Sequence, residues 1–319
     1  METKQPRLVV IVPCYNEQEV LPRTASQFIS VLQGLMDNGL VRSDSFLLFV
    51  DDGSRDETWK IISELSTAHM CVAGISQSRN RGHQYAIWTG LMEVRGKCDI
   101  TITVDCDGQD DLSAMEEMVR AYHAGNEIVY GVRSSRKTDA FFKRTTAQTF
   151  YRFLSWMGAE VVYNHADYRL IGRQALEALS EFHEVNLFIR GLIPLVGFKS
   201  SVVEYERAER IAGDSHYPLR KMMGLAIDGV TSLSVKPLRM VTIIGFCVSM
   251  LSFVGIAWAV LMVVLGHVVS GWASMTCIIC FVSGVQMMGI GVIGEYVGKI
   301  YLETKARPKS VISARVGDF

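Results

Sequence analysis

The chain has 319 residues, of which 49% are hydrophobic and 20% are charged, and its formal net charge is −1. The length predicts about two domains, and the near-neutral charge excludes a generally basic nucleic-acid binder. The apolar run at residues 8–13 is too short for a signal peptide, so the seven cysteines predict reduced thiols and no disulfide framework.

Four short apolar runs in the first third of the chain have the length and β-branched content of buried strands. They are residues 8–12, 46–50, 71–75 and 100–104. Each is followed by a polar turn and then a helical pattern, which extends to about residue 36, over 57–66, over 83–94 and from about 112. This alternation predicts an α/β domain with a mostly parallel sheet and helices on both faces. A further strand is expected over residues 127–132.

The acidic stretch DCDGQDD, residues 105–111, follows the fourth strand at the end where open α/β sheets bind ligands. Asp105 and Asp107 repel each other unless a cation lies between them, and Mg²⁺ typically combines one or two carboxylates with substrate phosphates. The stretch therefore predicts a metal–diphosphate site with Gln109 as a third oxygen ligand. Taken alone, it could instead be an acidic turn that caps the next helix.

Polar residues also follow the other three strands, and parallel strands bring such turns to one edge of the sheet. Tyr15 can stack on a base, Asp52 can accept a hydrogen bond from a base N–H, and Gly53 and Gly82 allow close backbone approach to a ligand. Singly, each residue is ordinary turn chemistry, but together they favour a nucleotide-diphosphate site. The chain has no GxxxxGK[ST], and no GxGxxG follows the first strand, so neither a P-loop NTPase nor a dinucleotide dehydrogenase is supported.

The segment after residue 132 is basic and aromatic. It contains Arg133, Arg136, Lys137, Lys143, Arg144 and Arg152 with a single acid, Asp139. Such a composition predicts a helix on the membrane surface; a helix packed on the sheet with a solvated basic face is the alternative. Farther on, Asp167 and Arg169 alternate as on a strand and so share one face, unless they form only a surface ion pair.

Residues 240–294 contain no Asp, Glu, Lys or Arg. A bilayer core needs about 20 apolar residues for each helix, so we expect two transmembrane helices, over 240–265 and 273–294. A buried helical hairpin in a soluble core is the alternative. Lysine and arginine flank both spans, whereas the connection between the spans has neither, which predicts that both termini are cytoplasmic. Cys277 and Cys280 lie inside the second span and are interpreted as small packing residues.

Six segments resemble family-2 glycosyltransferases of the polyprenyl-phosphate type, similar to bactoprenol glucosyltransferases and more distantly to dolichol-phosphate mannose synthases. They are VPCYNE (12–17), DDGSRDET (51–58), SRNRGH (78–83), DCDGQDD (105–111), DYRL (167–170) and GDSHYPLRKM (213–222). The similarity spans almost the whole chain. It implies a GT-A fold, Mg²⁺ or Mn²⁺, and inverting transfer of a single sugar from a nucleotide sugar, expected to be UDP-glucose or a related UDP-hexose, to polyprenyl (undecaprenyl) phosphate at the cytoplasmic membrane face.

The resemblance, together with the turn chemistry, also gives candidate site residues. For the donor nucleotide these are Pro13, Tyr15, Glu17, Asp52, Asn80, Gly82, Asp105, Arg210, Ser215 and His216. For the metal they are Asp105, Asp107 and Gln109. Arg133 and Arg144 match arginines that meet the acceptor phosphate. Asp167 matches the acidic residue usually discussed as the base, and Arg169 is expected beside it.

The chain departs from the family pattern at several positions. Gly108 and Asp111 replace Leu and Pro of the common DADLQDP. His216 replaces a lysine and is charged only at lower pH, and Arg81 stands where an aromatic residue is usual. These departures concern the identity of the donor more than the type of reaction.

The expected organisation is a cytoplasmic GT-A domain (1–215), a juxtamembrane amphipathic segment (216–239), a transmembrane hairpin (240–295) and a cytoplasmic tail (296–319). The expected partners are the nucleotide sugar, the lipid phosphate and the membrane, and the resemblance also allows a homo-oligomer. Two alternatives are a non-catalytic, membrane-anchored nucleotide-sugar sensor and a processive polysaccharide synthase. The intact acidic set argues against the sensor. The lack of a QxxRW signature argues against the synthase.

Overall fold

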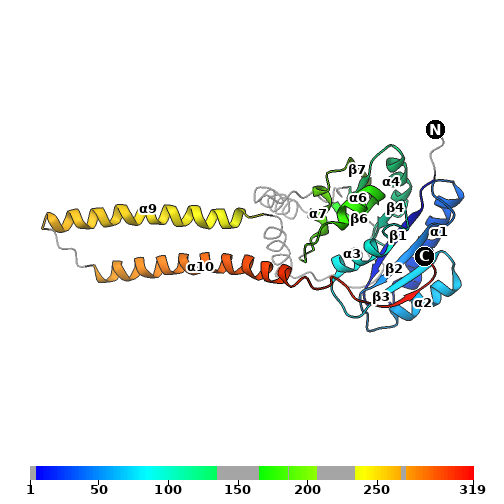
Figure 1. Cartoon of the computed structure of the whole chain (residues 1–319), viewed down its shortest axis with the longest axis horizontal. Coiled ribbons are helices and arrows are strands. Elements are labelled where there is room, and N and C mark those ends of the chain that lie inside the picture. The colour runs from blue at the N-terminus through cyan, green and yellow to red at the C-terminus, as the bar shows by residue number, and fades with distance from the viewer. Residues whose placement is uncertain (1–4, 135–164, 186, 207–233, 267–270) are drawn as a thin grey trace. The chain divides into compact units, whose positions relative to one another are not determined.

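The computed structural model describes residues 5–134, 165–185, 187–206, 234–266 and 271–319 (Figure 1). These residues form two compact units. The first holds the described residues up to 206 together with residues 307–319, and the second holds those from 234 to 306. The last residues of the chain therefore belong to the same unit as the N-terminal part.

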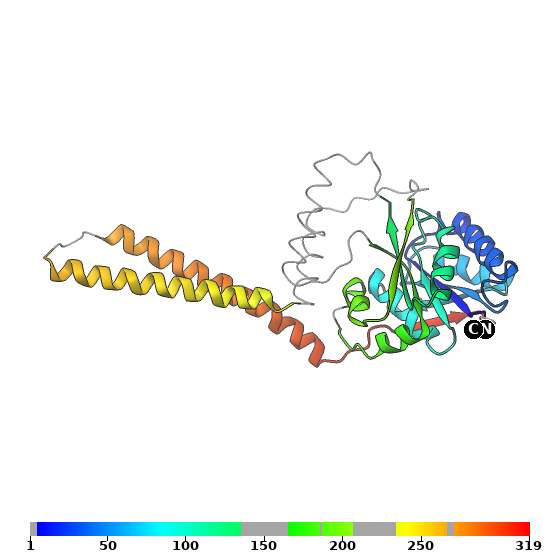
Figure 2. The same ribbon diagram turned by 90° about the horizontal axis from the view of Figure 1, so that it is seen from above.

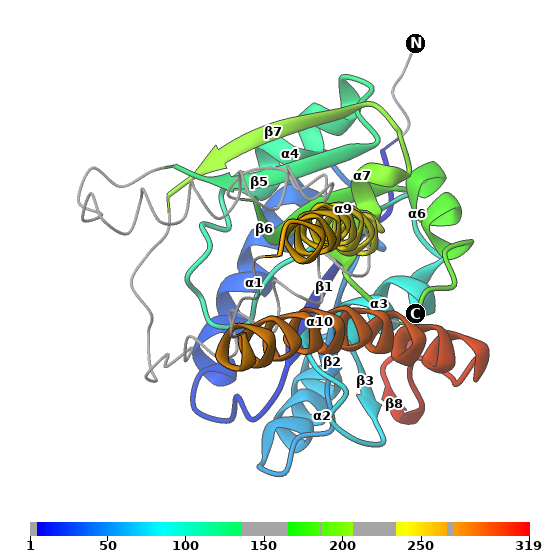
Figure 3. The ribbon, with the colours of Figure 1, turned by 90° about the vertical axis from the view of Figure 1, so that its left-hand side faces the viewer.

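Within the described residues, the first unit is built on one sheet of eight strands in the order β7-β5-β6-β4-β1-β2-β3-β8 (Figure 3). The bounds are β1 Leu8–Cys14, β2 Phe46–Asp51, β3 Val72–Gln77, β4 Ile100–Thr103, β5 Ile128–Arg133, β6 His165–Gly172, β7 Ser200–Tyr205 and β8 Ile312–Val316. Strands β4, β1, β2 and β3 are parallel neighbours, as are β5 and β7. Strand β6 is antiparallel to β4 and β5, and β8 is antiparallel to β3.

The five strands expected from the sequence are confirmed as β1 to β5, with ends that differ by one or two residues. Strand β1 continues past Val12, where the polar turn was expected to begin, and Pro13 pairs with Val50 of β2. Every residue of β1 is buried. Such all-buried apolar strands are typical of a parallel sheet that is covered on both faces.

Helices cover both faces of the sheet, as predicted. They are α1 Leu21–Asp37, α2 Thr58–Ala68, α3 His83–Val94, α4 Ala114–His123, α6 Arg173–Ser180 and α7 Ile189–Leu195. One apolar core lies between the sheet and α1, α2 and α4, with Phe28, Ile62 and Met118 as examples. A second core lies on the opposite face under α3, α6 and α7, with Ile87 and Leu192 as examples. The two cores hold the sheet between its two layers of helices.

The second unit consists of α9 Lys236–Val264 and α10 Trp272–Thr304. The two helices contact each other, and the Tyr296 hydroxyl of α10 donates to the carbonyl oxygen of Ser234, two residues before α9, at 2.6 Å. The residues Lys236–Met262 form a helix that is long and apolar enough to cross a membrane, the one such helix found in the described part of the chain. Large apolar side chains are exposed along both helices, among them Phe253 (70%) and Met288 (74%).

The C-terminal residues fold onto the first unit, which the sequence did not predict. Strand β8, red in Figure 2, extends the sheet beside β3. The Arg315 guanidinium forms two hydrogen bonds to the Glu93 carboxylate of α3, at 3.0 and 3.1 Å. The Lys309 ammonium lies 3.9 Å from the centre of the Trp88 ring. We call residues 307–319 the C-terminal strap.

The amphipathic juxtamembrane helices expected around residues 133–157 and 216–239 fall largely outside the described residues, as do Arg144, Arg210, Ser215 and His216. Their roles stay predictions.

Candidate active site

Three loops meet at the carboxyl ends of β1, β2 and β3. The backbone N–H groups of Arg81 and Gly82 donate to the two oxygens of Asp52, at 2.9 and 2.8 Å. Asp52 is buried, and burial raises the pKa of its carboxyl although these two N–H groups act against the shift. A Cβ at Gly53 would lie 2.5 Å from the Arg79 backbone, so this glycine serves the contact between two loops. Asp52 thus fixes the loop at residues 79–82.

The loop after β1 is attached to the loop after β2. The Asn16 N–H donates to the Ser54 hydroxyl at 2.9 Å, and the Glu17 N–H donates to the Thr58 hydroxyl at 2.8 Å. Asn16 adopts a positive φ of 54°. Tyr15 directly precedes these two anchors in the chain and is 41% exposed. An aromatic ring held open in this way can stack on a planar ligand.

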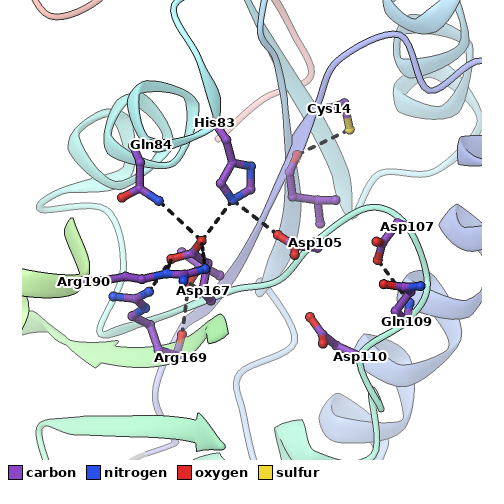
Figure 4. A network of polar contacts seen from close by, with 12 residues as sticks. Cys14, His83, Gln84, Asp105, Asp107, Gln109, Asp110, Asp167, Arg169 and Arg190 are labelled. Carbon is purple, nitrogen blue, oxygen red and sulfur yellow. Dashed lines mark hydrogen bonds and ion pairs between the residues drawn. The ribbon is translucent and has the colours of Figure 1, made fainter. Parts of the chain in front are cut away.

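The acidic loop 105–111 follows β4. Asp105 points toward His83, and its Oδ1 lies 3.4 Å from the His83 Nε2 (Figure 4). This oxygen is buried and makes no hydrogen bond in the described residues. Burial raises the pKa of Asp105; the nearby Asp167, Asp110 and Asp107 add to the shift and His83 opposes it. A buried carboxylate oxygen among other carboxylates calls for a cation.

The predicted metal ligands are only partly brought together. The Asp107 Oδ1 accepts the Gln109 N–H at 3.2 Å, and these two side chains lie together on the loop, apart from Asp105 (Figure 4). In the described chain no group of three or more His, Cys, Asp or Glu side chains is arranged to hold a metal. The oxygen donors fit a hard divalent ion whose other ligands come from a diphosphate and water.

Asp167 on β6 is the centre of a larger network (Figure 4). Its two oxygens accept hydrogen bonds from Arg169 and, in a bidentate pair, from the Arg190 Nε at 3.0 Å and Nη2 at 2.8 Å. Gln84 Nε2 donates to Oδ2 at 3.3 Å, and His83 Nε2 lies at the same distance from it. Asp167 and Arg169 therefore share one face of the strand, as predicted, but they form a buried pair.

The network determines the protonation of Asp167. Burial alone would raise its pKa, but the hydrogen bond with His83 and the charges of Arg169 and Arg190 outweigh burial and hold the pKa well below its ordinary value. The same two carboxylates, Asp167 and Asp105, raise the pKa of His83 against the effect of its burial. Asp167 is thus an anion with its lone pairs occupied, which makes it a weak base.

Arg133, the last residue of β5, belongs to a separate cluster. Its Nε donates to the Tyr205 hydroxyl at 3.2 Å, and its Nη2 lies 3.5 Å from Asp110 Oδ1. The Tyr205 hydroxyl donates to the same Asp110 oxygen at 2.7 Å. Asp110 and Tyr205 are buried, whereas the Arg133 side chain is 28% exposed. The buried pair therefore holds a partly exposed guanidinium in place.

The remaining described candidates are arranged more simply. Asn80 is exposed and Gly82 has a φ of 98° with open space around it. Sequence reasoning missed His83, Gln84, Arg190, Asp110 and Tyr205 as members of these clusters. A signal for Arg190 was present, since it is the only charged residue in the apolar run LFIRGLIPL, residues 187–195.

Comparison with known proteins adds the following. Residues 9–180 match the family Glycosyl transferase family 2. The chain is 47% identical to "Uncharacterized glycosyltransferase YkoT" of Bacillus subtilis (strain 168), over 98% of this chain and 93% of that protein. It is 37% identical to "Bactoprenol glucosyl transferase" of Shigella phage SfX, over 97% of this chain and 99% of that protein. A mannosyltransferase from Pyrobaculum calidifontis, solved with GDP-Man and Mn²⁺, aligns with a TM-score of 0.45 and 15% identity, covering 90% of this chain and 88% of that chain.

Proposed function

The chain belongs to glycosyl transferase family 2 and is a glycosyltransferase, and on that premise we propose that it is a polyprenyl-phosphate hexosyltransferase. In this proposal it transfers one sugar from a nucleoside-diphosphate sugar, UDP-glucose or a related UDP-hexose, to undecaprenyl phosphate. Transfer inverts the anomeric centre and takes place at the cytoplasmic face of the membrane. The near full-length similarity to proteins named bactoprenol glucosyl transferases supports the lipid acceptor.

The observation that carries the proposal is the buried Asp105 oxygen, which accepts no hydrogen bond from the described residues. It lies 3.4 Å from the His83 Nε2 and near three further carboxylates, at the edge where three further loops meet. A divalent cation, Mg²⁺ or Mn²⁺, would be held by Asp105, Asp107 and Gln109 together with the donor diphosphate. When bound, this ion supplies positive charge to the departing diphosphate. The site therefore suits a reaction whose leaving group is a nucleoside diphosphate.

The donor nucleotide is assigned to the loops after β1, β2 and β3. Tyr15 would stack on the base, and the nearby Pro13 and Glu17 would line the same side. Asp52 would accept the base N–H with the lone pairs that its two backbone hydrogen bonds leave over. Asn80 and Gly82 would lie beside the ribose and diphosphate. Arg210, Ser215 and His216 belong to the proposed segment that closes over the donor.

The acceptor determines what chemistry the protein must provide. The second pKa of a phosphate monoester is about 6, so at pH 7 it is largely a dianion that needs no general base. It does need cations, because it must approach a donor that is itself anionic. Arg133 and Arg144 are proposed to bind this phosphate, and arginine can do so through two parallel hydrogen bonds. Asp167, with its depressed pKa, would then orient the groups around it, Arg169 included, and act as a base only secondarily.

The fold also supports a transmembrane hairpin. The C-terminal strap and strands β1–β7 belong to one folded unit, so both lie on the same side of a bilayer. In this proposal the chain between them crosses the membrane an even number of times. Because α9 is long and apolar enough to cross, α10 would return, and its residues 272–294 carry no charge. The lysine and arginine flanks support the proposal that the unit and the strap are cytoplasmic.

The test is a donor screen with purified full-length protein in detergent. UDP-glucose, UDP-galactose, UDP-N-acetylglucosamine and GDP-mannose are each offered with undecaprenyl phosphate and Mg²⁺, and the lipid product is analysed by mass spectrometry. The proposal predicts a lipid that gains a single hexose with release of UDP. A polymer would indicate a processive synthase. Equally efficient glycosylation of a free alcohol or saccharide would overturn the acceptor assignment.

A further inference from the structure

Arg190 is a site residue to which the family resemblance assigned no role. It is the second residue of α7, and its guanidinium donates hydrogen bonds to both oxygens of Asp167. Asp167 is nearly enclosed, with 5% of its side chain exposed, whereas 34% of the Arg190 side chain is exposed. The guanidinium therefore has a fixed inner edge on a buried carboxylate and an outer part that solvent can reach.

A second arginine shares the same carboxylate. Arg169 also donates to Asp167 Oδ1, and only 2% of its side chain is exposed. Asp167 and Arg169 already form an opposite-charge pair of the kind that a buried carboxylate requires. Asp105 belongs to the same network, since the His83 Nε2 lies 3.4 Å from Asp105 Oδ1 and 3.3 Å from Asp167 Oδ2. Two carboxylates therefore face the two guanidinium groups, and of these two groups Arg190 is the one that an anion from solvent can reach.

The position of Arg190 is set by the start of α3, next to the donor loops. Gln84 accepts the N–H of Ile189 through Oε1 at 3.2 Å and donates to Asp167 through Nε2. The Tyr85 hydroxyl donates to the carbonyl oxygen of Val185 in the segment before α7. These bonds place Arg190 against α3 independently of its own pairing with Asp167.

The close-up shows which end of the site Arg190 occupies. His83, Asp167 and Asp105 lie between Arg190 on one side and Asp107 with Gln109 on the other (Figure 4). The proposed metal and donor diphosphate belong to Asp105, Asp107 and Gln109, which lie beyond Asp167 as seen from Arg190 (Figure 4). An anion bound by Arg190 would therefore face the sugar from the side opposite the leaving group, which is where an inverting nucleophile must lie.

We propose that Arg190 binds the phosphate of the prenyl phosphate acceptor and that Asp167 sets the plane of its guanidinium. This inference rests on the proposed function. In the transfer, an acceptor phosphate oxygen forms a bond to the anomeric carbon of the sugar while the bond from that carbon to the donor diphosphate breaks. The electron pair leaves with the nucleoside diphosphate, and no proton moves, because the attacking oxygen is already anionic. Arg190 lowers the negative charge on that oxygen's phosphate as the two anionic substrates meet.

The test compares Arg190→Gln and Arg190→Lys with wild type in steady-state transfer to undecaprenyl phosphate, using the nucleotide sugar that the wild type consumes. A hydrogen bond to a charged group contributes about 1.5–3 kcal/mol, so the KM for the acceptor should rise roughly ten- to hundredfold in Arg190→Gln. Arg190→Lys keeps the positive charge but loses the bidentate hydrogen bonds, so its acceptor KM should lie between those of Arg190→Gln and wild type. The donor KM and the affinity for UDP should stay within about twofold of wild type.

Arg173→Gln is the matched control. Arg173 directly follows β6, the strand that carries Asp167, at the end away from Asp167, and it pairs with the partly buried Asp99 at 3.5 Å. It should leave both KM values unchanged. Acceptor KM values within twofold of wild type in both Arg190 variants would overturn the inference, as would an equal rise of donor and acceptor KM. If Arg190→Gln fails to fold, the Lys variant decides. Wild type that transfers to no prenyl phosphate would refute the proposed function itself, which is a different result.

Discussion

The variant Asp167→Asn distinguishes two roles for Asp167, that of a structural anchor and that of a catalytic base. The change removes the charge from a buried group that accepts bonds from Arg169 and from both arms of Arg190. Breaking a buried ion pair by removing one partner typically costs about 3–5 kcal/mol. The amide keeps one acceptor oxygen, and Arg190 is one-third exposed (34%), where pairing is screened. The lower end of the range, about 3 kcal/mol, is therefore expected.

That cost is measurable as a shift in thermal unfolding. For a domain of this size about 1 kcal/mol corresponds to roughly 2–4 °C, so the Tm of Asp167→Asn should fall by about 6–12 °C. Asp44 provides a matched control, because Arg42 grips its two oxygens in the same bidentate way, at 2.8 and 2.7 Å, on the surface. Asp44 is 45% exposed, and Asp44→Asn should cost at most about 1 kcal/mol.

The pH dependence gives a second readout. The pKa of Asp167 is lower in the folded state than the ordinary value of about 3.9. The stabilisation is therefore fully present above about pH 4 and is lost as the pH falls through the folded-state pKa. Asp167 also raises the pKa of His83 in the folded state, and this second contribution to stability is present at acid pH and is lost as the pH rises through the folded-state pKa of His83. The difference in Tm between wild type and Asp167→Asn should therefore be larger near pH 5 than near pH 8. A difference that stays constant from pH 5 to pH 8 would contradict the coupling of His83 to Asp167.

The transfer assay then decides the role. If Asp167 only anchors Arg190, Asp167→Asn should retain measurable transfer. Its acceptor KM should be higher than that of wild type, because Arg190 loses the carboxylate that holds its guanidinium. As a general base, its removal would cost roughly a hundred- to ten-thousandfold in rate. An Asp167→Asn protein that is folded, binds both substrates normally and is wholly inactive would refute the anchor role.

Three further outcomes follow from the site and the fold. Asp107→Asn should lose most turnover with no change in Tm, and full activity of this variant in excess chelator would contradict a metal role. Tyr205→Phe removes the hydroxyl that donates to a buried Asp110 oxygen at 2.7 Å, so it should lower the free energy of unfolding by about 1–3 kcal/mol. It should also raise the acceptor KM, because Arg133 loses its hydrogen bond to Tyr205. An unchanged acceptor KM would show that Tyr205 does not position Arg133 for the acceptor. Val311→Cys, exposed at 57%, should react with an impermeant thiol reagent only after permeabilisation of cells, and labelling of intact cells would contradict a cytoplasmic strap.

The sequence predicts the central sheet well because its signal is local. Apolar β-branched runs bounded by polar turns define β1 to β4, and the residues at their carboxyl ends must then meet. Helix α3 begins and ends where the pattern predicted, at His83 and Val94. The end of β1 was placed too early because Pro13 looked like a turn residue. A proline fits there because the pairing of β1 with β4 ends at Ile11, and in the described sheet Pro13 has only β2 beside it. The missing N–H of the proline therefore breaks no ladder bond to β4.

The clusters around Asp167 and Asp110 could be predicted only in part. Spacing on one strand predicts that Asp167 and Arg169 share a face, because both lie on β6. Arg190 comes from α7, and its pairing depends on how far the chain travels between two elements, which periodicity does not encode. Tyr205 reaches Asp110 from β7 for the same reason. Residue types indicate which side chains could join such a cluster, but the tertiary packing of the elements determines which of them do.

Strand β8 lay beyond sequence reasoning for a different reason. The segment ISARV has only five residues and alternating burial, and it follows a long apolar helix with no strand nearby in sequence. A Cβ at Gly74 of β3 would lie 2.4 Å from an Ile62 methyl group of α2 and 3.0 Å from a Val316 methyl group of β8, so this glycine makes room for both elements. A glycine in a buried strand often marks such a close approach, but the sequence does not name the partner.

Arg81 connects the donor loop to the strap and gives a physical reason for one departure from the family pattern. Its N–H donates to Asp52, while its guanidinium donates to the carbonyl oxygens of Pro308 at 2.8 Å and Lys309 at 3.2 Å. An aromatic side chain at this position could make neither of the last two bonds. The residue that shapes the proposed nucleotide loop is therefore also the residue that holds the chain emerging from α10. Removal of the strap should therefore alter the donor loop at Arg81. The Arg81 guanidinium would lose both carbonyl partners, while its backbone N–H would still donate to Asp52.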